Sequence, residues 1–164
     1  MILVAVGTFI HGFDELVVAA DRAAAALGLA GFAQIGHSRA IPEHLAWERF
    51  LPPEALAARM AQAQVVVCHG GIGIIGEAMR AGKPIIAMPR RGRPSRASPA
   101  GDQTALVRRL AQRHGIEVCD EPAALASLLQ VLLGAGRPAQ PYDLVTDVPH
   151  LVARFLTATG APGP

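Results

Sequence analysis

The stretch that decides the fold is Val65-Val66-Val67-Cys68-His69-Gly70-Gly71-Ile72-Gly73-Ile74-Ile75-Gly76-Glu77, residues 65–77. Its first four residues form a continuous apolar run, which predicts a buried strand over 65–68. The glycines behind it permit a tight turn into a helix predicted over 71–80. Free N–H groups and the positive end of the dipole at such a helix start are suited to bind a pyrophosphate. The same glycines are equally typical of a closely packed turn without a ligand.

The pattern of short apolar runs and longer helical segments continues on both sides of this stretch. Further strands are predicted over 2–6, 32–35, 47–51, 83–88 and 116–119. Further helices are predicted over 13–27, 52–61, 102–114 and 121–133. Continuously apolar strands that alternate with helices indicate an α/β fold, a Rossmann-like parallel sheet with helices on both faces. A Gly/Pro-rich connector over 134–148 and a terminal helix over 149–158 complete one predicted domain, residues 1–164.

Composition points to one ordered domain in a reducing compartment. Of the 164 residues 51% are hydrophobic and 17% are charged, a balance typical of a chain with a substantial core. The net charge of +2 is too small to indicate nucleic-acid binding. No apolar stretch is long enough to span a membrane, and residues 1–6 lack the features of a secretion signal. Because Cys68 and Cys119 lie inside apolar runs, we expect free buried thiols and a cytoplasmic protein.

Candidate ligand residues follow the strands, because ligands of parallel sheets bind where the loops after the carboxyl ends gather. Gly7 and Thr8 follow the first strand without the G-x-G-x-x-G fingerprint, which disfavours a nicotinamide enzyme but leaves the Thr8 hydroxyl as a ligand donor. His69 ends its strand at the same edge, where a functional and a structural histidine are equally expected. It is the one candidate for a catalytic residue. The six histidines have no metal-ligand spacing, so no metal site is predicted.

Glu77 lies within the first two turns of the helix that follows the glycines. A carboxylate there can accept hydrogen bonds from both hydroxyls of a ribose. An acid near a helix N-terminus is also favourable by up to about 1 kcal/mol without any ligand. Glu77 is therefore a candidate ribose ligand beside a candidate phosphate site.

Taken together, the motifs at residues 4–8, 13–17, 34–36, 69–77, 82–90 and 102–103 are familiar. The chain resembles the C-terminal, donor-binding domain of glycosyltransferase family 28. It is most similar to stand-alone members that form the soluble half of a two-chain transferase. The similarity is specific over 65–103, looser over 1–36 and weak after residue 134.

The resemblance implies the C-terminal half of a GT-B fold and transfer of a sugar, with inversion, from a UDP-sugar to a lipid-linked or polysaccharide acceptor. It implies neither a metal ion nor any cofactor besides the donor. The donor-binding residues that it implies, together with those from the strand ends, are Gly7, Thr8, His69, Gly70, Gly71, Gly73, Glu77, Arg90, Asp102 and Gln103. Among them the glycines would lie beside the diphosphate, and Asp102 with Gln103 would bind hydroxyls of the transferred sugar. Arg90 would contact phosphate or acceptor.

Two features of the sequence differ from those expected of a complete enzyme of this family. Ile74 stands where relatives commonly carry Thr or Ser, which removes one hydrogen bond of about 0.5–1.5 kcal/mol to the ligand. No acid or histidine qualifies as the base that deprotonates the acceptor, and in two-domain relatives the acceptor side lies in the N-terminal half. We therefore expect a membrane-associated partner chain that recruits this protein to the inner face of the membrane, for exopolysaccharide or lipid-linked glycan synthesis.

Alternatives remain at this point. A non-catalytic interaction domain that kept the fold and lost donor binding is supported by Ile74 and the missing base. An independent nucleotide-dependent hydrolase or epimerase has no local catalytic pair in its favour. The arginine-rich segment 90–101 is interpreted as a solvated surface or as a contact for an anionic acceptor. A homodimer is possible when the partner is absent.

Overall fold

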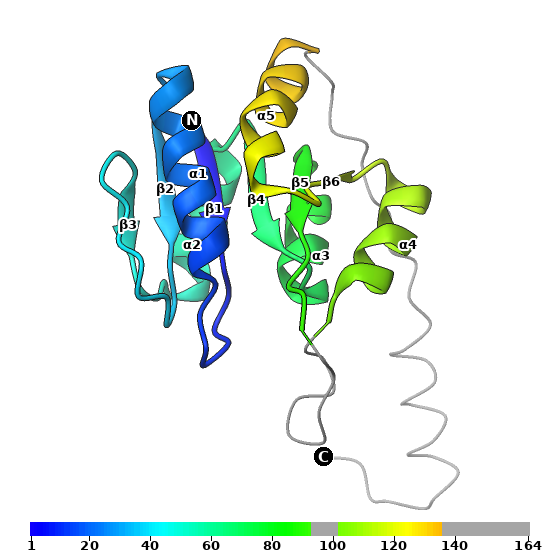
Figure 1. Cartoon of the computed structure of the whole chain (residues 1–164), viewed down its shortest axis with the longest axis horizontal. Helices are drawn as coiled ribbons and strands as arrows, with labels where there is room; N and C mark the ends of the chain where they lie inside the picture. Colours follow the sequence, from blue (N-terminus) through cyan, green and yellow to red (C-terminus); the bar gives the residue numbers. More distant parts are fainter. Residues whose placement is uncertain (93–101, 136–164) are drawn as a thin grey trace, which may run out of the picture.

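Six parallel strands pair in the order β3-β2-β1-β4-β5-β6, as Figure 1 shows. The computed structural model describes residues 1–92 and 102–135. The strands are β1 (Ile2–Ala5), β2 (Gly31–Gln34), β3 (Ala46–Glu48), β4 (Val65–His69), β5 (Ile85–Met88) and β6 (Glu117–Val118). The helices are α1 (Asp14–Leu27), α2 (Pro53–Gln62), α3 (Ile72–Arg80), α4 (Thr104–His114), the 3-10 turn η1 (Pro122–Ala124) and α5 (Leu125–Gly134). The predicted parallel sheet is confirmed.

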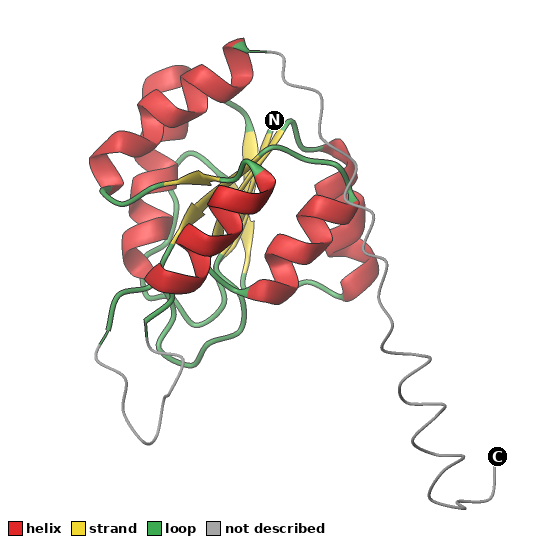
Figure 2. Ribbon diagram, turned by 90° about the vertical axis from the view of Figure 1, so that its right-hand side faces the viewer, coloured by secondary structure: helices red, strands yellow, loops and turns green. Residues whose placement is uncertain are grey.

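Helices cover both faces of the sheet (Figure 2). Alternate residues of each strand point to opposite faces, so Ile2 and Val4 face one helical layer while Leu3 and Ala5 face the other. The first layer consists of α1 and α5, and the second consists of α2, α3 and α4. The central strands β1 and β4 are buried on both faces, which explains their uninterrupted apolar sequence.

Several predicted bounds are wrong by a few residues. The third strand spans 46–48, not 47–51, because it pairs only with β2 and its three residues are exposed at the sheet edge. The fifth strand begins at Ile85, since Gly82 and Lys83 donate their N–H groups back to α3 and end that helix. The helix predicted from 102 begins at Thr104, whose N–H is bound by the Asp102 carboxylate at 2.8 Å. The predicted terminal helix and all but the first two residues of the connector lie outside the described residues.

A buried carboxylate on α1 holds the chain that connects β2 to β3. Asp21 is 8% exposed and accepts hydrogen bonds from the N–H groups of Glu43, His44 and Leu45 at 2.9, 3.0 and 2.9 Å. Burial raises the pKa of Asp21, but these three donors outweigh it and lower the pKa below the ordinary value. The segment after β2 is thereby fixed against α1.

Both cysteines are buried and free, as predicted. Within residues 1–92 and 102–135, no helix has the length and apolar character needed to cross a membrane.

Candidate functional site

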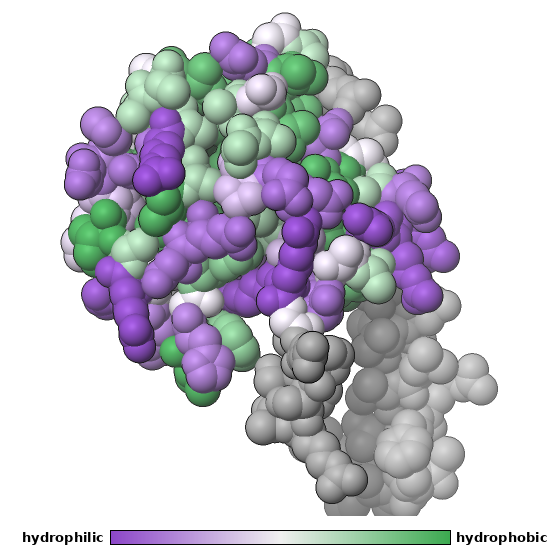
Figure 3. Space-filling model, in the orientation of Figure 1, coloured by the Kyte–Doolittle hydropathy of each residue, from purple (hydrophilic) through white to green (hydrophobic). Residues whose placement is uncertain are grey.

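The loops after β1, β4 and β5 meet at the carboxyl edge of the sheet, in the lower part of Figure 1. Hydrophilic side chains gather over the lower part of this view, whereas its upper part is more apolar (Figure 3). Side-chain contacts join the predicted residues here. Arg90 Nη1 lies 3.2 Å from His69 Nδ1, and the Gly70 N–H donates to Gln103 Oε1 at 2.9 Å. Three segments, at residues 69–70, 90 and 103, thus form one site.

The imidazole of His69 fills a slot between two glycines. A Cβ added at Gly7 would lie 2.6 Å from His69 Nε2, and one added at Gly71 would lie 2.0 Å from Cε1. Gly7 also has a φ of 74°, in the left-handed region that favours glycine. Both positions therefore exclude any side chain. Burial first, and the charge of Arg90 second, lower the pKa of His69 to about 4, so the ring is neutral at physiological pH.

Arg90 is a cation without a carboxylate partner in the described part of the chain. Its Nη2 donates to the Val6 carbonyl, and its guanidinium carbon lies 4.9 and 5.2 Å from the ring centroids of Phe9 and Phe13. Its Nε is buried and has no hydrogen-bond partner. Burial lowers the pKa of Arg90 to about 10, yet the group stays charged near neutral pH. An anion bound nearby would offset this charge.

The start of α3 has backbone donors that the protein does not use. Gly71 is the N-cap without a side-chain cap, and the first turn contains no acid. The first helical hydrogen bond runs from Ile75 N to Gly71 O at 3.1 Å. The N–H groups of Ile72, Gly73 and Ile74 precede it and have no partner among the described residues. They remain available to an external acceptor.

The three glycines of this turn have different reasons to be glycine. A Cβ at Gly70 would lie 2.4 Å from Val107 Cγ2, and one at Gly71 would collide with His69. Internal packing thus accounts for both. A Cβ at Gly73 would meet nothing within 4 Å, and Gly73 has no positive φ. Neither packing against the described residues nor backbone geometry requires glycine there.

The side chains of the other predicted residues are exposed and make few contacts within the protein, with one exception. The Glu77 side chain is exposed on α3 without a hydrogen bond or ion pair in the described part of the chain, and Thr8 is exposed after β1. Asp102 is exposed, and its pKa is lowered by hydrogen bonds from Thr104. The exception is Gln103, whose side-chain oxygen accepts from two backbone N–H groups. Ile74 is half-buried against the α3-side core, so apolar packing replaces the hydroxyl expected there.

Sequence reasoning missed the surroundings of Arg90. The Val6 carbonyl and the two phenylalanine rings come from a segment more than 75 residues earlier, and no local motif marks them. Arg91, by contrast, is half-exposed and pairs with Asp120 and Glu121 at 3.3 and 3.5 Å, which favours the surface interpretation for this arginine. Arg93 and Arg96 lie outside the described residues.

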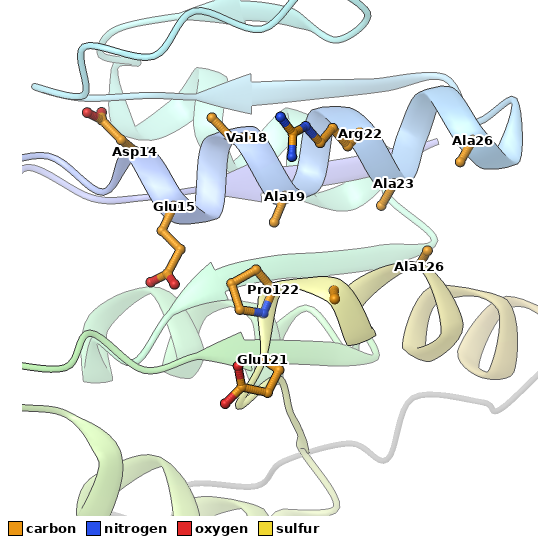
Figure 4. A pocket seen from close by; sticks show the side chains of 11 residues that line it. Asp14, Glu15, Val18, Ala19, Arg22, Ala23, Ala26, Glu121, Pro122 and Ala126 are labelled. Atoms are coloured by element: carbon orange, nitrogen blue, oxygen red, sulfur yellow. The ribbon is translucent and has the colours of Figure 1, made fainter.

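A separate groove of about 700 Å³ lies between α1 and the η1–α5 segment (Figure 4). It is lined mainly by small apolar side chains such as Val18, Ala19 and Ala126, with Glu15 and Glu121 at one end. None of the predicted site residues lines it. Within residues 1–92 and 102–135 no group of His, Cys, Asp or Glu side chains is arranged to hold a metal ion.

Fold and site define a Rossmann-like α/β domain with its ligand edge at the carboxyl ends of the strands. The model of the glycosyltransferase family 28 C-terminal domain matches residues 1–133. The chain therefore belongs to this family, and the predicted resemblance is confirmed. No curated protein sequence matches the chain.

Solved structures share the fold. Glycosyltransferase VinC in complex with dTDP is 18% identical to this chain with a TM-score of 0.63, and the match covers 98% of this chain and 42% of the VinC chain. The calicheamicin glycosyltransferase CalG4 is 20% identical with a TM-score of 0.62, covering 98% and 44%. UDP-GlcNAc 2-epimerase from Neisseria meningitidis bound to UDP-GlcNAc is 12% identical with a TM-score of 0.58, covering 95% and 43%. The chain thus spans less than half of these proteins, and the predicted match to the C-terminal half of a GT-B fold is confirmed.

Proposed function

We propose that this chain is the UDP-sugar-binding subunit of an inverting, metal-independent glycosyltransferase that acts with a membrane-associated partner on a lipid-linked or polysaccharide acceptor. Family membership supports the transferase class. The observation that carries donor binding is the start of α3, where Gly73 opens to empty space beside three unused N–H groups. Such a helix start binds phosphate groups through its amides and its dipole.

The remaining site residues fit the other parts of a nucleotide sugar. Arg90 supplies a fixed positive charge that lacks a counter-ion among the described residues, which suits a diphosphate. Glu77 lies on the same helix and has two free carboxylate oxygens for the ribose hydroxyls. Gly7 borders the slot of His69, Thr8 follows it in the sequence, and Asp102 is exposed directly before Gln103. We place the transferred sugar near Asp102.

The chemistry needs one bond formed and one broken. The acceptor oxygen attacks the anomeric carbon, the bond from that carbon to the diphosphate breaks, and UDP leaves with the additional negative charge. Arg90 and the α3 amides are pre-oriented to stabilise that charge as it develops, the role that a metal ion has in other transferases. This arrangement supports metal independence.

The acceptor proton requires a base from elsewhere. His69 is a poor candidate, because two donor groups face its Nδ1 and its pKa is about 4. We therefore infer that the partner supplies the base, and that the isolated chain binds donor without transferring sugar. Docking on this partner would bring a cytoplasmic chain to the inner membrane face, where exopolysaccharide or lipid-linked glycan is assembled. Without its partner, the isolated chain would form a homodimer.

The second candidate function is an interaction domain that has lost donor binding. The packed side chain of Ile74 favours it, since that position contributes no hydroxyl to a ligand. Sugar transfer by the reconstituted pair, abolished by Glu77→Ala, would exclude this alternative.

Calorimetry with UDP and UDP-glucose tests donor binding. We expect saturable binding by the wild type and weaker binding by Glu77→Gln. Glu43→Gln is the matched control, because Glu43 is also exposed and uses only its backbone N–H, toward Asp21. Absence of binding to either compound, also with a candidate partner present, would refute the proposal.

A further inference from the structure

Helix α1 forms a ridge on the surface between two grooves. Val18, Arg22 and Ala26 line the groove of about 700 Å³ shown in Figure 4, and they also line a second groove of about 640 Å³ on the side of the β2–β3 connection. Because the same three side chains border both hollows, this face of α1 protrudes between them. We call Glu15, Val18, Ala19, Arg22 and Ala26 the α1 ridge. None of the predicted site residues lines either groove.

The middle of the α1 ridge is apolar. Val18 is 38% exposed, and Ile41, which lines the second groove with it, is 46% exposed. The first groove is lined there by the small side chains of Ala19 and Ala126, which leave room for a second helix to approach closely. An exposed apolar surface bordered by charged residues is typical of a protein–protein contact.

Opposite charges lie on either side of this apolar middle. Glu15 and Arg22 are both exposed, and neither side chain has a hydrogen bond or ion pair in the described part of the chain. They are seven residues apart, so they lie on the same face of α1 but about 10.5 Å apart along its axis, too far to pair with each other. The midpoint between them falls at Val18 and Ala19. The α1 ridge is therefore complementary in charge to an antiparallel copy of itself.

We propose that the α1 ridge is the interface of a symmetric homodimer, in which α1 packs antiparallel against α1 of a second copy of this chain. A two-fold axis beside Val18 and Ala19 brings each Val18 against its own copy and each Glu15 opposite the second copy's Arg22. Such self-complementarity is what an interface between identical surfaces requires. The inference rests on the proposed function only for the pairing of the isolated chain with itself, to which it assigns a surface.

Charge exchange tests the antiparallel pairing. Glu15→Arg and Arg22→Glu each place like charges opposite one another twice per dimer, and each should raise the Kd of the dimer at least about tenfold. The double variant with both substitutions restores opposite charges, so its Kd should return to within about threefold of the wild-type value. Arg109→Glu is the matched control, because Arg109 is exposed on α4 in the other helical layer.

The apolar middle has a closely matched control as well. Val18→Asp should give a monomer, whereas Leu106→Asp should leave the dimer unchanged, since Leu106 has the same 38% exposure on α4. In the symmetric dimer Val18→Cys should form a disulfide with its own copy when oxidised glutathione is added. The two native cysteines are buried, so they should not contribute to this cross-link.

Sedimentation equilibrium over a concentration series measures the Kd of each variant. A chain that stays monomeric at about 1 mM would overturn the inference. The same holds for a dimer that survives Val18→Asp and both charge reversals, or for a double variant that does not regain the dimer. If Val18→Asp instead abolishes only the binding of a membrane-associated partner, the ridge belongs to that partner and the homodimer is refuted. Should a charge reversal unfold the chain, the Val18→Cys cross-link still decides between these results.

Donor binding gives a readout that is independent of the dimer. Arg22→Glu should bind UDP as tightly as the wild type, because Arg22 lies outside the predicted site residues. If the wild type dimerises through the α1 ridge but binds neither UDP nor UDP-glucose, the proposed donor binding fails and the inference stands. If the wild type binds UDP as a monomer, donor binding stands and the inference fails.

Discussion

Replacing Gly73 with alanine should change stability and ligand affinity in opposite directions. Gly73 is the second residue of α3, its φ is not positive, and an added Cβ meets no atom within 4 Å. Alanine is favoured over glycine in a helix by up to about 1 kcal/mol. The variant should therefore unfold at the wild-type temperature or up to about 4 °C above it.

The same methyl group would obstruct a phosphate that approaches the backbone of α3. Loss of one hydrogen bond to a charged ligand group costs about 1.5 kcal/mol or more, which corresponds to at least about tenfold in Kd. Calorimetric titration with UDP and thermal unfolding of the same preparations measure the two effects. Gly134→Ala is the control. Its added Cβ also meets nothing within 4 Å, and Gly134 is the last residue of α5, distant in sequence from α3.

A particular combination of results would refute this reasoning. If Gly73→Ala is as stable as expected and binds UDP as tightly as the wild type, no ligand approaches this backbone, and the glycine has no role in donor binding. Gly71→Ala provides a contrast, because its Cβ would lie 2.0 Å from His69 Cε1 and should destabilise the fold directly.

Three further predictions concern single carboxylates and the buried histidine. Glu77→Gln should weaken UDP binding about tenfold without changing stability, and the loss should be smaller with 2′-deoxyuridine diphosphate, which offers Glu77 only one of the two ribose hydroxyls. The pKa of His69 is about 4 when folded against about 6.5 when unfolded, so the unfolded state binds more protons between these values. Stability should therefore fall as pH drops through this window, by up to about 3 kcal/mol, and denaturant titrations of His69→Asn should lack this contribution. Asp21→Asn should lower the free energy of unfolding by about 1–3 kcal/mol, because an amide nitrogen would face one of the three N–H donors; an unchanged melting temperature would contradict this.

The alternation of strands and helices could be predicted from the sequence because it depends on local periodicity. The apolar runs of β1 and β4 and the glycines behind β4 indicate buried parallel strands and a ligand edge at their carboxyl ends. The edge strand β3 was predicted too long, since its exposed residues lack the burial pattern that marks central strands. The 3-10 turn before α5 was likewise not distinguished from the helix.

By itself, the sequence determined the fold class, because residue types at short spacing specify the strands and helices, and its resemblance to glycosyltransferase family 28 indicated the family. Only the tertiary structure decided what each residue does there. Gly70 and Gly71 serve internal packing while Gly73 faces open space, a distinction that arises from Val107 and His69. The partners of Arg90 and Gln103 lie as far as 84 and 34 residues away along the chain. Contacts at such separations depend on how the strands are ordered in the sheet, which no local pattern specifies.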